Sequence, residues 1–259
     1  MDAAHIRPLD WDSRHFGFPV AELAAEVGDE EELRAVLSRA ADTGVHLLYW
    51  LAPESFRPTQ DTLTRFGGRR VVGYRRYRRD LTHADALAES DPRCVSVLGT
   101  EPDDAMYALA LLAGALSRFK LDDRISDERF EAMYRIWLER SLAGELAADV
   151  LVLRAGDGRP LSLVSYRIRD GMAEIGLVST APEAQKKGYG SALLTEVHRR
   201  ARGAGCRAVE VATQTENRGA CRLYEQAGYS VVHRGDHYHF FLASALPRGR
   251  GKAEPESPS

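Results

Sequence analysis

The spacing of apolar residues predicts an α/β arrangement in the first third of the chain. A helix with one apolar face is predicted where apolar residues recur at intervals of three and four, at Leu33, Val36, Leu37, Ala40 and Ala41. Residues 45–51 and 71–81 are rich in strand formers, and a short helical segment at 61–66 ends at two glycines. We therefore predict a small N-terminal α/β domain over residues 1–85.

The rest of the chain alternates strand and helix signals in the same way. Residues 80–93 are polar and contain a proline, so we place a linker there. Strands are predicted at 94–98, 150–154, 161–169, 173–178, 208–212, 229–233 and 237–242. Helices are predicted at 100–117, from 126, from 188 and at 217–227. This pattern predicts an α/β domain over residues 94–246. The composition of residues 247–259 predicts a disordered tail.

The composition is that of an ordinary globular protein. Of the 259 residues, 44% are hydrophobic and 28% are charged, and the net charge is −3. These values exclude a collagen-like or disordered chain and argue against a dedicated nucleic-acid binder, although residues 69–79 are rich in arginine. No apolar run reaches the ~20 residues of a membrane span, and residues 1–5 do not resemble a signal peptide. Three scattered cysteines predict neither disulfides nor zinc, so we expect a cytoplasmic protein.

The most informative segment is a glycine-containing turn between a strand and a helix. After the strand, residues 185–190 read Gln-Lys-Lys-Gly-Tyr-Gly, and an apolar helical stripe follows them. The free N–H groups and dipole of a helix start favour a phosphate group, and glycines let that group approach the backbone. The turn lacks the Lys-Ser/Thr ending of a Walker A motif and the third glycine of the dinucleotide motif. A plain helix start is the alternative interpretation.

The turn and a second pattern downstream resemble a known superfamily. Gln185-x-x-Gly188-x-Gly190 is similar to the (Q/R)xxGx(G/A) pyrophosphate motif of the GNAT acetyltransferases, and residues 217–229 resemble their second motif. The two motifs cover about residues 150–242. Residues 9–17, 117–137 and 211–217 extend the resemblance over nearly the whole chain, toward the family of TDP-fucosamine acetyltransferases. These enzymes N-acetylate a TDP-linked 4-amino-4,6-dideoxyhexose. The resemblance implies an α/β GNAT fold with a mixed, twisted sheet. It also implies acetyl-CoA as co-substrate and no metal.

The resemblance also implies which residues hold the co-substrate. Leu177, Val178 and Ser179 would pair their backbone with the pantetheine arm of acetyl-CoA, in the manner of an added strand. Asn217 would reach the pantetheine or an ordered water. The turn and the start of its helix would bind the pyrophosphate through Gln185, Lys186, Lys187, Gly188, Tyr189, Gly190 and Ser191.

Two residues are candidates for the proton transfers of acetyl transfer to an amine. The resemblance implies Tyr224 as the general acid beside the sulfur, although its place in an apolar helical stripe also suits a core tyrosine. Glu174 is a candidate base, directly or through water, but alternation along its strand leaves its direction open. His198 is expected on the outside of its helix. His237 and His239 share a strand face without a third ligand, so no metal site is predicted.

The acceptor site is predicted in a polar connection between two helices. A nucleotide sugar needs positive charge and a ring to stack on, for which the candidates are Arg118, Phe119, Lys120 and Arg124. A solvated loop is the alternative, and Asp122 and Asp123 would instead favour a cationic amine. An aminoglycoside, an amino acid or a protein N-terminus also remain open as acceptors, and so does a non-catalytic CoA-binding protein. By analogy with the superfamily, a homodimer could form through a strand edge at 237–242.

Overall fold

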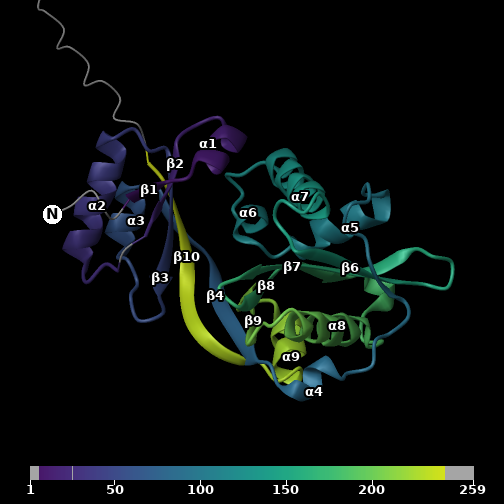
Figure 1. The fold of residues 1–259 in the computed structure, drawn as a ribbon. Helices are drawn as coiled ribbons and strands as arrows, with labels where there is room; N and C mark the ends of the chain where they lie inside the picture. Colours follow the sequence, from purple (N-terminus) through teal and green to yellow (C-terminus); the bar gives the residue numbers. More distant parts are fainter. Residues whose placement is uncertain (1–5, 25, 243–259) are drawn as a thin grey trace, which may run out of the picture. The chain divides into compact units, whose positions relative to one another are not determined.

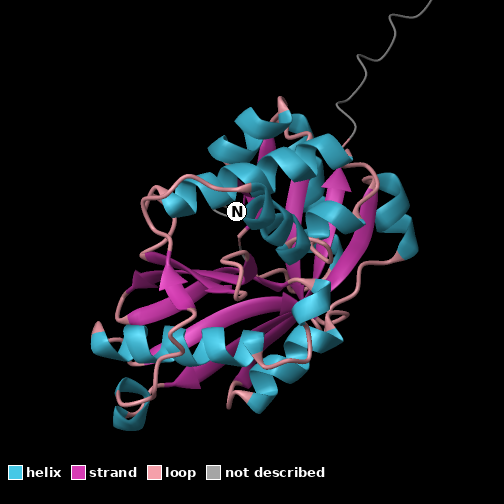
Figure 2. Ribbon diagram, turned by 90° about the vertical axis from the view of Figure 1, so that its right-hand side faces the viewer, coloured by secondary structure: helices cyan, strands magenta, loops and turns pink. Residues whose placement is uncertain are grey.

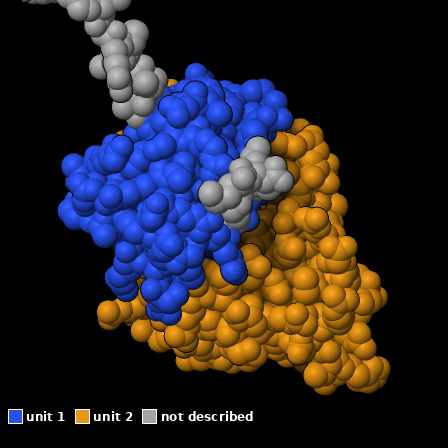
Figure 3. Space-filling view, turned by 90° about the vertical axis from the view of Figure 1, so that its left-hand side faces the viewer, with its two compact units in different colours: residues 1–70, 238–259 blue, residues 71–237 orange. Residues whose placement is uncertain are grey.

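The computed structural model describes residues 6–24 and 26–242 and divides the chain into two compact units. Unit 1 consists of residues 1–70 and 238–259, and unit 2 of residues 71–237 (Figure 3). The chain passes between the units in strands β4 (Gly68–Asp80) and β10 (Ser230–Phe241). The units are therefore bounded differently from the predicted domains, because the C-terminal strand returns to the N-terminal unit. The domain assignment 1–85 and 94–246 stays a prediction, and the predicted tail at 247–259 lies outside the described residues.

Unit 1 is a small α/β unit, in agreement with the predicted fold class. Its strand order is β1-β2-β3-β10-β4, and it uses the last residues of β10 and the first of β4. β1 and β2 are antiparallel, whereas β2 and β3 are parallel. Its other elements are β1 (Ile6–Pro8), α1 (Asp10–Phe16), β2 (Val20–Leu23), α2 (Glu30–Asp42), β3 (Leu47–Pro53) and α3 (Gln60–Arg65). The predicted apolar face of α2 is buried in the core of this unit, which confirms the helix.

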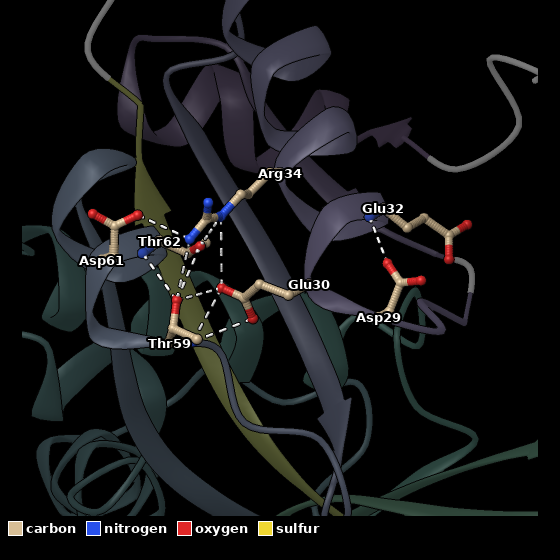
Figure 4. Close-up of polar contacts among 7 residues, drawn as sticks. All are labelled: Asp29, Glu30, Glu32, Arg34, Thr59, Asp61 and Thr62. Carbon is tan, nitrogen blue, oxygen red and sulfur yellow. Dashed lines mark hydrogen bonds and ion pairs between the residues drawn. The ribbon is translucent and has the colours of Figure 1, made fainter.

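A polar network joins α2 to the start of α3 (Figure 4). Thr59 caps α3, and its backbone N–H and hydroxyl both donate to the Glu30 carboxylate, the hydroxyl at 2.6 Å. Arg34 donates to the buried Thr62 hydroxyl at 2.6 Å and to Asp61 at 2.8 Å. Burial alone would raise the pKa of Glu30, but the hydrogen bonds from Thr59 and Thr62 lower it. The charged side chains of Glu30 and Arg34 therefore both have polar partners, and these contacts hold α2 and α3 together.

Unit 2 is a mixed sheet with helices on both faces (Figures 1 and 2). Its strand order is β10-β4-β9-β8-β7-β6-β5, and β8 and β9 are parallel. α5 packs on β7 and β8 and α7 on β6, while α8 covers the opposite face. The remaining strands are β5 (Cys94–Ser96), β6 (Asp149–Arg154), β7 (Pro160–Arg169), β8 (Met172–Thr180) and β9 (Ala208–Gln214). The helices are α4 (His83–Ala86), α5 (Asp104–Ala113), α6 (Arg118–Leu121), α7 (Asp127–Leu142), α8 (Tyr189–Gly203) and α9 (Arg218–Gln226).

The fold corrects three expectations from the sequence. The predicted linker at 80–93 contains α4, which begins with a capping box between Thr82 and Asp85. The two strands predicted at 229–233 and 237–242 are a single strand, β10, because the Arg-Gly-Asp segment between them continues the strand instead of turning. β10 has β3 and β4 as neighbours, so it is not the free edge on which the predicted dimer was based.

His198 is buried, not exposed as predicted. Its side chain lies on α8 with 5% of its surface exposed, and its Nε2 is 2.8 Å from the Tyr229 hydroxyl. Burial, with a smaller contribution from Arg79, lowers the pKa of the imidazole from 6.5 to about 4. The folded protein therefore holds His198 neutral in a pH range where the unfolded chain binds a proton.

We expect His198 to make the protein sensitive to acid. Its contribution to stability is complete above pH 6.5 and is lost as the pH falls toward 4, by about 2 kcal/mol at pH 5. In His198→Gln, whose amide can still hydrogen bond Tyr229, the free energy of unfolding should fall less between pH 7 and pH 5. Chemical denaturation at both pH values measures this difference. The exposed His83→Gln is the control, and an equal pH dependence in wild type and His198→Gln would contradict the assignment.

Candidate active site

Strands β8 and β9 separate in the middle of the sheet of unit 2. Their parallel pairing runs from Met172 and Ala208 to Ile175 and Val211, although β8 continues to Thr180 and β9 to Gln214. No β8–β9 pair follows Ile175 within the described residues. A cavity of about 330 Å³ opens at this point, lined by residues 175–178 of β8 and 212–214 of β9. The facing backbone edges of the two strands are therefore open to a ligand at this cavity.

A β-bulge in β8 lies next to the separation. Ser165 of β7 is opposite both Gly176 and Leu177, and its hydroxyl oxygen accepts a hydrogen bond from the Leu177 N–H at 2.9 Å. A Cβ at Gly176 would lie 3.1 Å from that oxygen, which explains a glycine here. Ile175 packs in the core beneath α8, and strict alternation would direct Ser179 to the same side. The bulge reverses this direction, so that Ser179 donates to a backbone carbonyl of α5 at 2.7 Å.

The cavity reaches both faces of the sheet. Tyr224 lines it from α9 on one face, while Tyr134 and Trp137 line it from α7 on the other. The Tyr224 side chain is buried, with ring contacts to Tyr77 and Tyr229, and its hydroxyl makes no hydrogen bond in the described part of the chain. Burial, with smaller contributions from Cys221 and Tyr77, raises the pKa of Tyr224 above its ordinary value. The hydroxyl is therefore protonated at neutral pH and can act as a proton donor.

Glu174 lies at the cavity on the α7 side of the sheet. It pairs directly with Arg167 across β7 and β8, and the Arg167 Nε donates to its carboxylate at 2.7 Å. Both side chains line the cavity and are reachable from solvent. The alternation of side chains along the strand did not determine the direction of Glu174. In the structure its side chain lies toward the cavity.

The predicted phosphate turn leads into α8. Gly188 is the N-cap residue with a φ of +84°, and no side chain caps the helix there. Lys186 has a φ of +60°, which is unusual for a residue other than glycine. The first N–H groups of α8, from Gly188 to Ser191, have no partner within the helix. A Cβ at Gly190 would lie 3.1 Å from Leu223 of α9, so the missing side chain at Gly190 allows two helices to pack closely.

Other predicted site residues are used partly within the protein. The Asn217 oxygen accepts from the Ala220 N–H at 3.1 Å and caps α9, while the residue also lines the cavity. This use of the oxygen leaves the amide NH₂ as the group that Asn217 can offer to a ligand. The Gln185 side chain donates to the Thr180 carbonyl at 3.2 Å and thereby closes the turn.

The four predicted acceptor residues do not come together at the cavity. The Arg118 guanidinium lies over the Phe119 ring, and Phe119 is buried against Trp137. Lys120 forms an ion pair with Asp127 at 2.6 Å. Arg124 donates to the buried Asp122 at 2.7 Å. None of the four is among the described residues that line the cavity, so their proposed role stays a prediction.

The α7 side of the cavity contains residues to which the sequence assigned no role. Tyr134 and Trp137 lie on the apolar face of α7, and such a face by itself indicates only a core contact. Arg167 is one of several exposed strand arginines. A surplus of large aromatic residues on one helix face was the only available signal. It did not show that part of that face borders a cavity.

The comparison with protein families decides what this part of the chain is. Residues 115–229 match the acetyltransferase (GNAT) family. These residues are similar to the GNAT acetyltransferases over somewhat less than half of the chain. The match includes the separated strands, the glycine turn and Tyr224, and it makes the protein an acyl-CoA-dependent acetyltransferase. No curated protein matches the chain.

Solved structures share the fold of this chain. A GCN5-related N-acetyltransferase from Sphaerobacter thermophilus is 20% identical with a TM-score of 0.60, over 90% of this chain and 75% of that chain. A functionally unknown conserved protein from Staphylococcus epidermidis is 14% identical with a TM-score of 0.61, over 87% of this chain and 84% of that chain. At these identities the likeness shows the fold alone. It confirms the prediction of a GNAT fold with a mixed sheet.

Two further features concern metals and membranes. Within residues 6–24 and 26–242, no cluster of three or more His, Cys, Asp or Glu side chains could hold a metal ion. In the same described part of the chain, no helix has the length and apolar character needed to cross a membrane.

Proposed function

We propose that this protein transfers the acetyl group of acetyl-CoA directly to a primary amine at the cavity between β8 and β9. The observation that carries the proposal is the separation of these strands beside Tyr224. It is joined by the uncapped start of α8, where a Cβ at Gly190 would lie 3.7 Å from the hydroxyl oxygen of Thr180 at the end of β8. The separation offers backbone groups to an extended pantetheine arm, and the helix start offers N–H groups to a pyrophosphate. Such a combination suits a long thiol cofactor with a phosphorylated end.

Each predicted cofactor residue has a part in this proposal. The backbone of Leu177, Val178 and Ser179 pairs with pantetheine, because the edge of β8 toward β9 is open there. The amide NH₂ of Asn217 reaches the same arm. The turn at residues 185–191 holds the pyrophosphate through its backbone N–H groups, with charge from Lys186 and Lys187.

The proposed reaction is aminolysis of the thioester. The amine nitrogen attacks the acetyl carbonyl carbon, a C–N bond forms, and the C–S bond breaks as the tetrahedral intermediate collapses. The leaving sulfur takes the hydroxyl proton of Tyr224, which is later restored from solvent. From ordinary values of about 8.5 for a thiol and 10 for a phenol, this transfer is uphill by only ~2 kcal/mol. Burial raises the pKa of Tyr224 and so weakens it as an acid, but burial also disfavours a thiolate, so the two effects oppose each other.

The amine must lose a proton before or during its attack. Glu174 faces the cavity and is the proposed acceptor of that proton, directly or through a water. Holding the amine and the thioester together contributes more than either proton transfer, up to about 7–11 kcal/mol in well-oriented systems.

The proposed acceptor is the amine of a TDP-linked amino-deoxy sugar. The support is the sequence resemblance over nearly the whole chain, together with the aromatic wall of Tyr134 and Trp137 on the acceptor side of the cavity. The apolar face of a deoxy-sugar ring suits such a wall. The experiment is release of free CoA thiol from acetyl-CoA with TDP-amino sugars, aminoglycosides and amino acids. Release with none of them, in protein shown to bind acetyl-CoA, would contradict the proposed catalysis.

Gly188→Ala is expected to weaken acetyl-CoA binding by about tenfold or more, because a Cβ at a positive φ disturbs the turn that holds the pyrophosphate. Gly205→Ala is a matched control, since Gly205 follows the other end of α8 with the same φ of +84°, and neither added Cβ meets an atom within 4 Å. Both variants should lose a similar ~1 kcal/mol of stability. Calorimetric titration with acetyl-CoA measures the difference. Equal affinities in the two variants would place the pyrophosphate elsewhere.

A further inference from the structure

The acceptor side of the cavity contains an ion pair that a substrate can reach. Arg167 and Glu174 are direct neighbours on β7 and β8, and both line the cavity. We propose that the acceptor amine also bears an oxyanion, a carboxylate or a phosphate, and that Arg167 binds this oxyanion while Glu174 receives the amine. This inference rests on the proposed acetyl transfer and specifies the class of acceptor.

The ion pair is open enough to be exchanged for contacts with a ligand. The side chains of Arg167 and Glu174 are 55% and 29% exposed. Ion pairs with this exposure contribute little to stability, because water solvates both charges well. A ligand that offers equivalent partners can therefore separate the pair without destabilising the strands.

Glu174 keeps a second cation nearby when Arg167 turns to a ligand. The pKa of Arg76 is raised chiefly by its hydrogen bond to Tyr74, and further by the carboxylates of Glu210 and Glu174. Arg76 therefore lies within electrostatic range of Glu174. The Glu174 carboxylate is not left without positive charge if the Arg167 guanidinium moves away from it.

A zwitterionic acceptor matches both members of the pair. Its ammonium group approaches the Glu174 carboxylate, and its oxyanion meets the planar fork of Arg167, which can donate two parallel hydrogen bonds. One internal ion pair is thus replaced by two between protein and ligand. An amine without an oxyanion forms only the ion pair with Glu174. It also separates Arg167 from the Glu174 carboxylate and gives Arg167 no new partner. A polycationic aminoglycoside brings further positive charge toward Arg167, so the arrangement disfavours it.

The test compares acceptors in matched pairs, with thiol release from acetyl-CoA as the readout. One pair is a TDP-4-amino-4,6-dideoxyhexose and the methyl glycoside of the same amino sugar, and the other is an L-amino acid and its methyl ester. The wild-type enzyme is expected to acetylate one of the two pairs. Within that pair, kcat/KM should be higher for the anionic member. A preference in the first pair identifies a phosphate as the oxyanion, and a preference in the second a carboxylate.

Arg167→Gln should remove this preference. A hydrogen bond to a charged group corresponds to about 10–100-fold in kcat/KM, which the variant should lose for the anionic member while the neutral member changes little. Arg169→Gln is the matched control, because Arg169 lies on the same strand, is exposed and does not line the cavity. A wild type that uses both members of a pair equally overturns the inference, and so does an equal loss for both members in Arg167→Gln. If none of the acceptors causes thiol release, the proposed acetyl transfer itself is overturned.

Discussion

Replacement of Tyr224 by phenylalanine is expected to lower kcat by about 100–10,000-fold, the usual contribution of a positioned general acid. The ring of Tyr224 is buried between Tyr77 and Tyr229, and its hydroxyl makes no hydrogen bond among the described residues. The substitution therefore removes only the hydroxyl that is proposed to donate a proton to the sulfur. Folding and acetyl-CoA affinity should change little, because no hydrogen bond within the protein is lost.

Tyr77→Phe is the matched control for this prediction. Tyr77 is another buried tyrosine of the same core, but its hydroxyl donates to Glu225 at 2.8 Å and it does not line the cavity. Steady-state kinetics should show a near-normal kcat for Tyr77→Phe. An unchanged kcat in Tyr224→Phe would remove the general acid role, whereas equal losses in both variants would indicate an effect on packing.

The glycine turn and α8 could be predicted from the sequence because their signals are local. The apolar stripe of α8 has helical spacing, and Gly188 has the left-handed backbone conformation that glycine adopts most easily. Helix starts depend on the residues that form them, so the turn could be located without knowledge of the fold. The same holds for α2, whose buried face was identified from spacing alone.

The cavity could not be predicted, because it depends on pairing between distant strands. The bulge at Gly176 changes which side of the sheet the following residues face, and nothing in the spacing of β8 indicates where an extra residue enters. The separation of β8 from β9 after Ile175 is likewise a property of two strands that are far apart in the sequence. For this reason the sequence indicated Glu174 as a candidate without showing its direction.

The predicted acceptor residues show what a sequence leaves undetermined about its charges. Lys120 and Arg124 suggested an anion site, but each forms an ion pair with an aspartate close by in the chain. A sequence shows that charges are present but not which of them neutralise each other. The His198 prediction was wrong for a similar reason, since the Tyr229 hydroxyl that satisfies the buried imidazole lies directly before β10, far along the chain.

Gly114→Ala should disturb the acceptor side of the cavity by displacing Tyr134. Gly114 caps the end of α5 with an ordinary φ of −88°, so its backbone conformation accepts alanine. A Cβ there would lie 2.4 Å from Cζ and 2.6 Å from Cε1 of the Tyr134 ring. That ring is buried between Phe130 and Trp137, with ring centroids 4.9 Å from each, and cannot move aside freely. We expect a loss of about 1–3 kcal/mol in the free energy of unfolding, as in other overpacked cores.

The same substitution should raise the KM of the acceptor and leave acetyl-CoA affinity unchanged, because Tyr134 lines the cavity opposite Tyr224. Gly203→Ala is the control, since its added Cβ at the end of α8 meets no atom within 4 Å and should be neutral or stabilising. Tyr134→Ala removes the ring, so adding Gly114→Ala to that variant should cost little further stability. An equal loss of stability from Gly114→Ala in the wild type and in Tyr134→Ala would show that Gly114 acts through some other contact. Tyr134 would then not be the residue that links α5 to the aromatic side of the cavity.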